Sequence, residues 1–353
     1  MKSKIITFLF VGCLIFYGVL GILFEDAVFS VTERRKFASV PKFVFSNEYI
    51  KDLDKYILDQ FPFRDQFRSI KAKFNYNILG KLDNNGVFLK DGYIYKSIYP
   101  TNIDSINNFL KKTDKVSNDF LDNNIYLMII PDKNYYLDDD KFLNIDYDYI
   151  YNRVNELGFI NIDIRDLMDI HDYYETDTHF RQERLDKVVQ RMGMVMNFNY
   201  YNVNYEVNVY DKFYGVYYGE ALINRKPERL VYLDSEIFDS VSVKYLENDK
   251  LNSIYNLDKL EGMDAYEVYL DGASAFIEIY NSSSNINKEL IVFRDSFGSS
   301  LVPLLVPYYR KITLIDNRYI NSDNYRLLIE KNNQDILFMY STLLVNNSSS
   351  LKG

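Results

Sequence analysis

Two different spacings of apolar residues alternate along this chain. Short runs such as 125–130 and 290–293 are continuously apolar, as expected of strands buried on both faces. Between such runs, apolar residues recur every three or four positions, which is the spacing of one helix face. Regular alternation of strands and helices predicts an α/β fold in which helices cover both faces of a parallel sheet.

The predicted elements fall into a regular part and an insertion. The predicted strands of the regular part are residues 125–130, 160–164, 290–293, 312–315 and 336–340. Its predicted helices are residues 103–120, 149–157, 184–196 and 325–330, and a helix that begins at Phe297. Residues 203–280 instead contain alternating stretches and predict a β-rich insertion. The predicted strands of the insertion are residues 205–210, 230–233, 241–245, 266–270 and 275–280.

The residues before the regular part predict two helices and a hairpin. Residues 46–58 have helical spacing, with Ser46 as the N-cap. Residues 65–79 form a second helix with one apolar stripe, which consists of Phe67, Ile70, Phe74 and Ile78. Turn signals next to residues 87–89 and 93–95 predict a small β-hairpin.

The first residues carry a membrane signal. Residues 5–24 contain no charge, and a run of about 20 apolar residues crosses a bilayer. Lys2 and Lys4 favour a cytoplasmic N-terminus, whereas residues 34–36 add positive charge on the other flank. The run is longer than a usual signal-peptide core and no convincing cleavage site follows, so an anchor is favoured over a cleaved signal peptide. We therefore expect a single-pass cell-membrane protein with its C-terminal domain outside the cytoplasm.

A chain of 353 residues is long enough for one large domain or two ordinary ones. It contains no internal repeat and no long low-complexity linker. The predicted regions are a signal anchor at 1–24, a juxtamembrane linker and helix at 25–60, the α/β domain at 61–345 and a disordered tail at 346–353.

Composition and charge exclude several kinds of partner. The formal net charge of −9 argues against nucleic acid, because phosphate binding needs a basic surface. The single cysteine, Cys13, excludes disulfides and cysteine-based zinc sites within one chain. The 33 Tyr and 25 Phe suit a sugar-binding surface, although a compositional bias of the genome explains them more simply. We expect no metal, since a metal site needs more ligands and only His171 lies near His179, eight residues before it. We also expect no cofactor.

The scarcity of histidine draws attention to one segment. His179 follows Asp177 by two positions, and Ser296 lies where an apolar run ends and a helical run begins. Together they are the parts of a triad of nucleophile, base and orienting acid. Ser296 also falls at the carboxyl end of a predicted parallel strand, where sites in such sheets lie. Each signal has a simpler explanation, because a serine at a helix start is usually a cap and Asp-x-His occurs in solvated loops.

Four segments match the motifs of one known group in kind and in order. Residues 176–180 (Thr-Asp-Thr-His-Phe) are similar to its Asp-Thr-His-Trp or Asp-His-His-Trp motif, and residues 294–297 (Arg-Asp-Ser-Phe) to its Gly-Asp-Ser-Phe/Tyr motif. Residues 33–41 resemble a Glu-Asn-Arg-x-Leu-Ala-x-x-Pro opening, and residues 61–65 with 85–87 the segment after it. The chain thus resembles the SGNH hydrolase-like proteins of polysaccharide O-acetylation, of the AlgJ/AlgX type and the DHHW family, over most of its length beyond the anchor.

The resemblance implies an SGNH-like fold and an extracytoplasmic acetyltransferase or acetylesterase. Ser296 would form an acyl-Ser intermediate, His179 would move its proton, and Asp177 would orient His179. The resemblance also implies a polysaccharide substrate and a membrane-bound acyltransferase that supplies acetyl groups. Phe180 stands where the group has Trp, and Arg294 where it has Gly or Lys.

The remaining groups that would bind the oxyanion are less defined. The main-chain amide of Ser296 is one expected donor. Ordinary SGNH enzymes add a Gly and an Asn from later loops, and neither is evident after Ser296. The further candidates for oxyanion or substrate binding are Asp295, Arg294, Gly215 and Asn281.

Two other readings remain open on the sequence. A non-catalytic scaffold that binds polysaccharide in an acetylation complex would keep the same fold, and the altered motif positions favour it. Transfer to a sugar and hydrolysis by water differ only in the acceptor, which the sequence does not decide.

Overall fold

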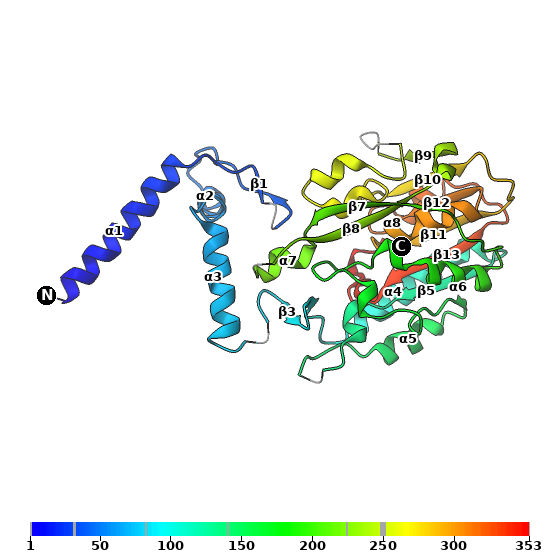
Figure 1. The fold of residues 1–353 in the computed structure, drawn as a ribbon, viewed down its shortest axis with the longest axis horizontal. Helices are drawn as coiled ribbons and strands as arrows, with labels where there is room; N and C mark the ends of the chain where they lie inside the picture. Colours follow the sequence, from blue (N-terminus) through cyan, green and yellow to red (C-terminus); the bar gives the residue numbers. More distant parts are fainter. Residues whose placement is uncertain are drawn as a thin grey trace. The chain divides into compact units, whose positions relative to one another are not determined.

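A central sheet organises the larger part of the chain (Figure 1). The structure, a computed structural model, describes residues 2–30, 33–81, 83–139, 141–223, 225–247 and 252–352. Within these residues the sheet has seven strands, which are β5 (Ile125–Ile130), β6 (Ile160–Asn161), β9 (Val241–Tyr245), β10 (Phe276–Asn281), β11 (Glu289–Arg294), β12 (Lys311–Ile315) and β13 (Asp335–Ser341). Their order is β6-β5-β13-β11-β12-β10-β9, in which the strands from β6 to β12 are parallel and β10 is antiparallel to both neighbours.

Helices and short ribbons complete the fold. The α-helices are α1 (Lys2–Leu23), α2 (Asn47–Asp59), α3 (Arg64–Asn77), α4 (Ile103–Ser117), α5 (Tyr147–Asn155), α6 (Asp186–Met196), α7 (Val216–Ala221), α8 (Gly298–Leu301), α9 (Ser322–Tyr325) and α10 (Thr342–Val345). The ribbons pair β1 (Phe29–Ser30) with β2 (Arg35–Lys36), β3 (Val87–Lys90) with β4 (Tyr93–Lys96), and β7 (Glu206–Phe213) with β8 (Glu228–Asp234).

Both faces of the sheet are buried, which explains why its strands are continuously apolar. Along β11, Leu290 and Val292 face one core, whereas Ile291 and Phe293 face the other. Residues of α6 and of the 3-10 helix Val302–Tyr308 complete the first core, and residues of α4, α5 and α10 complete the second. Alternate residues of a strand point to opposite faces, so an apolar residue is needed at every position. The predicted α/β fold with a largely parallel sheet is confirmed.

We predicted that residues 203–280 form one β-rich insertion. In the structure these residues contribute to two separate β arrangements. The strands β7 and β8 pair as an antiparallel ribbon, whereas β9 and β10 extend the main sheet beyond β12. The strand predicted at residues 266–270 is wrong, because Ala265–Val268 forms a 3-10 helix. Its N-cap Asp264 accepts a hydrogen bond from the N–H of Tyr266 at 3.0 Å. This local bond supplies the backbone with a partner that a strand would find elsewhere.

The C-terminal residues also differ from the prediction of a disordered tail. After α10 they form the 3-10 helix Ser348–Ser350, which packs against α4. The N–H of Ser348 donates to the hydroxyl of Ser105 at 2.6 Å, and Leu351 is buried in the second core. Contacts with residues far away in sequence therefore order this segment, although its own composition did not indicate an ordered structure. Gly353 lies outside the described residues.

The chain divides into two compact units, Met1–Leu89 with Val216–Lys226, and Lys90–Gly215 with Pro227–Gly353. We call them the anchor unit and the sheet unit. The anchor unit contains α1, whose segment Lys4–Leu23 has 20 residues and a mean hydropathy of 2.5. Among the described residues this is the one helix long and apolar enough to cross a membrane.

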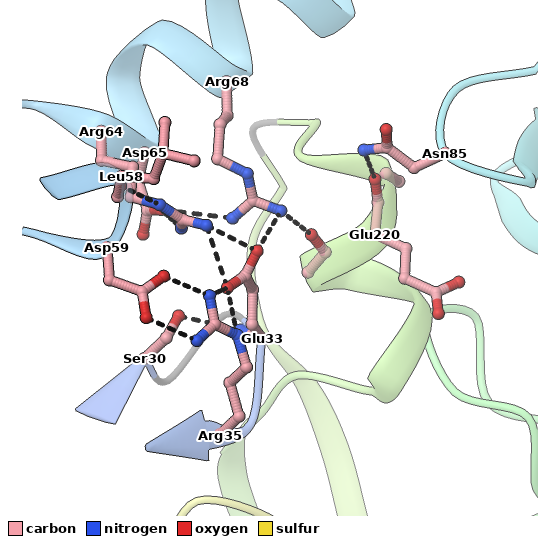
Figure 2. A network of polar contacts seen from close by, with 12 residues as sticks. Ser30, Glu33, Arg35, Leu58, Asp59, Arg64, Asp65, Arg68, Asn85 and Glu220 are labelled. Carbon is pink, nitrogen blue, oxygen red and sulfur yellow. Dashed lines mark hydrogen bonds and ion pairs between the residues drawn. The ribbon is translucent and has the colours of Figure 1, made fainter. Parts of the chain in front are cut away.

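An ionic network holds the short elements of the anchor unit together (Figure 2). Asp59, at the end of α2, accepts hydrogen bonds from both terminal nitrogens of Arg35, at 2.8 and 2.5 Å. This contact lowers the pKa of Asp59 to about 2. Glu33 pairs with Arg64 and with Arg68 of α3, each at 2.9 Å. The β1–β2 ribbon is thereby bound to both helices.

We expect Phe293→Ala to be among the most destabilising substitutions in the sheet. The Phe293 ring stacks on Phe338 at 4.9 Å between centroids and contacts Phe120 and Tyr325 edge-on. Truncation should lower the free energy of unfolding by about 3–5 kcal/mol, because it leaves a cavity. Urea titration of the full chain in detergent measures this loss. The control Leu143→Ala removes a side chain that is 65% exposed and should cost less than ~0.5 kcal/mol. Equal losses would contradict the assigned core.

Candidate active site

Ser296 lies in the turn between β11 and α8, at the carboxyl edge of the parallel strands. Its side chain is partly exposed, whereas the other residues of 290–300 are buried. Asp295 fixes the turn, since one of its oxygens accepts from the N–H of Phe297 at 3.0 Å. The other oxygen accepts from the N–H and the hydroxyl of Ser341, at 2.8 and 2.7 Å. Both carboxylate oxygens of Asp295 thus have partners within the fold, and Asp295 stabilises the turn.

The structure brings Ser296, His179 and Asp177 into one chain of hydrogen bonds. The hydroxyl of Ser296 lies 2.8 Å from Nε2 of His179, and Nδ1 of His179 lies 2.6 Å from Oδ1 of Asp177. Asp177 is fully buried and His179 is 8% exposed. A carboxylate at this distance fixes the imidazole tautomer with the proton on Nδ1, which leaves Nε2 to accept from the serine hydroxyl.

A tight turn, rather than an extended loop, joins Asp177 to His179. The main-chain N–H of His179 donates to the same oxygen, Asp177 Oδ1, at 3.1 Å. Bonds from an Asp side chain to the N–H two positions later are typical of Asx-turns. The sequence analysis grouped the two residues as base and orienting acid, and in the structure this turn brings them together.

Tyr266 forms one wall of the site and was not found from the sequence. Its ring stacks on the imidazole of His179, with centroids 3.8 Å apart and planes 6° from parallel. Its hydroxyl lies 2.8 Å from the hydroxyl of Ser300 on α8. Burial raises the pKa of Tyr266 well above its usual value, so the phenol is neutral. Tyr266 is one of 33 tyrosines, and nothing in its local sequence distinguishes it from the others.

A second buried carboxylate holds the loop immediately before Asp177. Glu228, at the start of β8, accepts from the N–H of Glu175 and from the N–H of Thr176, both at 2.8 Å, and from the Thr176 hydroxyl. Glu228 lies about 50 positions away in sequence, so only the folded chain shows this contact.

Gly215 contacts the same loop from another side. Its N–H donates to the Thr176 hydroxyl at 2.8 Å, so this donor has a partner in the fold. A Cβ atom at position 215 would overlap main-chain atoms of Thr176 and Asp177. Gly215 was predicted as a candidate oxyanion donor, and the structure instead places it as a support of the loop that carries Asp177.

Arg294 is buried beneath the turn rather than exposed to a substrate. It is 1% exposed, and its Nη1 donates to the hydroxyl of Ser299 at 2.9 Å and to the carbonyl of Asp295 at 3.3 Å. Burial lowers the pKa of the guanidinium, and nearby Asp316 opposes this effect. The side chain also packs under Gly298, where an added Cβ would lie 3.0 Å from it. Arg294 therefore supports the turn that carries Ser296 through its bonds to Asp295 and Ser299.

The structure does not bring Asn281 to the site. Asn281 ends β10, and β10 runs antiparallel to β12, so its end lies at the opposite edge of the sheet from Ser296. Its amide donates to the carbonyl of Val306 at 3.3 Å and its oxygen accepts from Ser283. The sequence showed the asparagine but not the direction of its strand.

Comparisons with known proteins identify this fold. No family model and no curated protein matches the sequence. A DHHW family protein from Eubacterium siraeum is similar over 77% of this chain and 97% of its own, with 18% identity and a TM-score of 0.63. Bacillus cereus PatB1 is similar over 73% of this chain and 96% of its own, with 16% identity and a TM-score of 0.59.

PatB1 also matches in a structure with a sulfonyl adduct, with a TM-score of 0.58. The O-acetyltransferase domain of Pseudomonas putida AlgJ matches more loosely, over 74% of this chain and 92% of its own, with 10% identity and a TM-score of 0.44. The likeness to the DHHW family protein and to PatB1 confirms, for the fold, the resemblance that the motifs indicated.

We expect Gly215→Ala to destabilise the loop that carries Asp177. The added methyl group has no space next to the Thr176 backbone, and overpacking against a rigid neighbour costs about 1–3 kcal/mol or more. Thermal unfolding of the full chain should show a lower midpoint. The control Gly21→Ala adds the same methyl group where no atom lies within 4 Å, and its midpoint should not fall. An unchanged midpoint for Gly215→Ala would contradict the close approach.

Proposed function

We propose that this chain is an extracytoplasmic O-acetyltransferase or acetylesterase that acts on a polysaccharide through an acyl-Ser intermediate. The observation that carries the proposal is the chain of hydrogen bonds from Ser296 through His179 to Asp177, at 2.8 and 2.6 Å. An alcohol is a weak nucleophile unless an adjacent base takes its proton. Here the base, its orienting acid and a partly exposed hydroxyl lie within hydrogen-bonding distance of one another.

The first half of the reaction transfers acetyl to the enzyme. Nε2 of His179 accepts the proton of Ser296 while Oγ attacks the acetyl carbonyl carbon. The carbonyl oxygen takes up negative charge, and the main-chain N–H of Ser296 is the proposed donor to it. His179 then gives its proton to the leaving group of the donor, and the acetyl-Ser ester remains. Asp177 stays ionised and stabilises the imidazolium while it exists.

The second half repeats the same proton movements with another nucleophile. A sugar hydroxyl, or water, gives its proton to His179 and attacks the acetyl-Ser carbonyl. Ser296 leaves with the proton that His179 returns. A sugar acceptor makes the protein a transferase, and water makes it an esterase.

Two further observations support the proposal. PatB1, which has the same fold, is known with a sulfonyl adduct, and sulfonyl groups attach to activated nucleophiles. The motifs at residues 176–180 and 294–297 resemble those of proteins of polysaccharide O-acetylation. From that resemblance we propose the polysaccharide substrate and a membrane-bound acyltransferase as the source of acetyl groups. The helix α1 would hold the protein at the membrane, with the sheet unit outside the cytoplasm.

The first test is hydrolysis of 4-nitrophenyl acetate by the full chain in detergent. We expect Ser296→Ala, His179→Ala and Asp177→Asn each to lower kcat/KM by roughly 10³–10⁴-fold, because triad members act as a unit. His171→Ala is the matched control, since it removes the only other histidine, which is exposed and contacts Tyr93. Its activity should equal that of the wild type. Phenylmethanesulfonyl fluoride should label Ser296, as located by peptide mass. Equal rates in the wild type and Ser296→Ala would leave the non-catalytic scaffold as the explanation.

A second test concerns Tyr266 as a positioning residue. An aromatic face against imidazolium stabilises it by about 1–2 kcal/mol in a desolvated site, which is roughly tenfold in rate. We therefore expect Tyr266→Leu to lower kcat about tenfold with little change in KM. Tyr266→Phe keeps the stacked ring and should restore most of kcat, although it loses the bond to Ser300. Equal loss in both variants would assign the effect to the hydroxyl instead of the ring.

A further inference from the structure

The helix α3 presents its apolar stripe outward. Phe67, Ile70, Phe74 and Ile78 are between 43% and 69% exposed, whereas the buried side chains of α3 are Ala72 and Asn75. An amphipathic helix of a water-soluble unit usually buries its apolar stripe. The periodicity predicted the stripe correctly, but these side chains are largely exposed instead of buried.

Neighbouring residues extend the exposed apolar surface. Ile57 and Leu58 at the end of α2 are each more than half exposed, and Phe61 and Phe63 between the helices are 37% and 46% exposed. We call these four residues and the α3 stripe the apolar corner. An exposed apolar surface built from successive elements marks an interaction site, because isolated exposed residues are common but contiguous ones are not.

The ionic network fixes which side of these helices faces outward (Figure 2). Asp59 is buried against Arg35, and Arg68 of α3 bonds both to Glu33 and to the carbonyl of Gly219. Turning either helix over would break these contacts and leave Asp59 as a buried charge without a partner. The outward position of the apolar corner is therefore a property of the folded anchor unit.

Contacts with α1 show which part of that helix the apolar corner lies beside. The Phe61 ring stacks on Tyr17 at 5.2 Å, and Phe67 contacts the same ring at 5.7 Å. Tyr17 lies six residues before Leu23, the last residue of α1, which is about 9 Å along a helix. A groove of about 430 Å³ between α1 and α2 is lined in part by Leu14, Tyr17 and Ile57. If α1 crosses the bilayer, these residues lie within its hydrocarbon region.

We infer that the apolar corner is embedded in the acyl chains of the non-cytoplasmic leaflet, so that the anchor unit has a second membrane attachment beside α1. The lipid is the occupant that the contacts favour, because the corner is continuous with a helix whose own surroundings are lipid. Lys71 and Lys73 are exposed on α3, and basic side chains with apolar stems are common on helices that lie at the membrane interface. The inference rests on α1 remaining in the membrane and is independent of the proposed chemistry.

The composition of the chain provides a direct test, because it contains no tryptophan. We would place a single tryptophan in the full chain by Phe67→Trp or Ile70→Trp and reconstitute each variant in phosphatidylcholine vesicles. The control Leu121→Trp replaces a side chain of the sheet unit that is 75% exposed. Vesicles with brominated acyl chains should quench the emission of the two corner variants, and that emission should lie at shorter wavelength than the control's. The control should keep its emission.

Other results would overturn the inference. Emission of both corner variants that is as long in wavelength and as unquenched as in Leu121→Trp would mean that water covers the corner. Emission at shorter wavelength without quenching would mean that protein covers it, from a second copy or another chain. Thermal unfolding shows whether each variant is folded without reference to the proposed chemistry. Hydrolysis of 4-nitrophenyl acetate in the same vesicles then separates failure of this inference from failure of the proposed function.

Discussion

One oxygen atom of a buried carboxylate determines the geometry of the candidate site. Oδ1 of Asp177 accepts from both the ring and the main chain of His179, so a single atom sets the position and the tautomer of the base. Burial without these donors would be costly, which makes the arrangement cooperative. Glu228 acts in the same way on the residues that lead into Asp177, because its carboxylate accepts from the main-chain N–H groups of Glu175 and Thr176.

The edge of the sheet that carries Ser296 is built in the same way. Three parallel strands end beside buried aspartates, namely Asp132 after β5, Asp295 after β11 and Asp316 after β12. Asp132 and Asp295 accept from Thr342 and Ser341, which stand next to each other at the end of β13. Each carboxylate thus ties a turn to the neighbouring strand or to its own loop. A rigid edge of this kind keeps the nucleophile turn fixed against a base that comes from a different part of the chain.

The sequence predicted those parts of the structure that depend on local pattern. The strands at 125–130 and 241–245 have the predicted bounds, because burial on both faces and alternation leave direct marks in the sequence. The meeting of Asp177, His179 and Ser296 followed from strand ends and motif order. Tyr266 and Glu228 were missed, since their roles depend on contacts between segments far apart. The α3 stripe shows a different limit, because periodicity gives an apolar face but not what covers it.

The loop backbone packs so closely against Gly215 that it limits which substitutions this protein can accept during evolution. Gly215 bonds to Thr176 and has no room for any side chain, although it takes no part in the chemistry proposed for Ser296. Selection acts on the fold as much as on the reacting atoms, so a position without a functional group becomes as invariant as one with it. Homologues that keep the Asp-x-His turn would keep glycine here, and a lineage that lost this glycine would have to rebuild the loop.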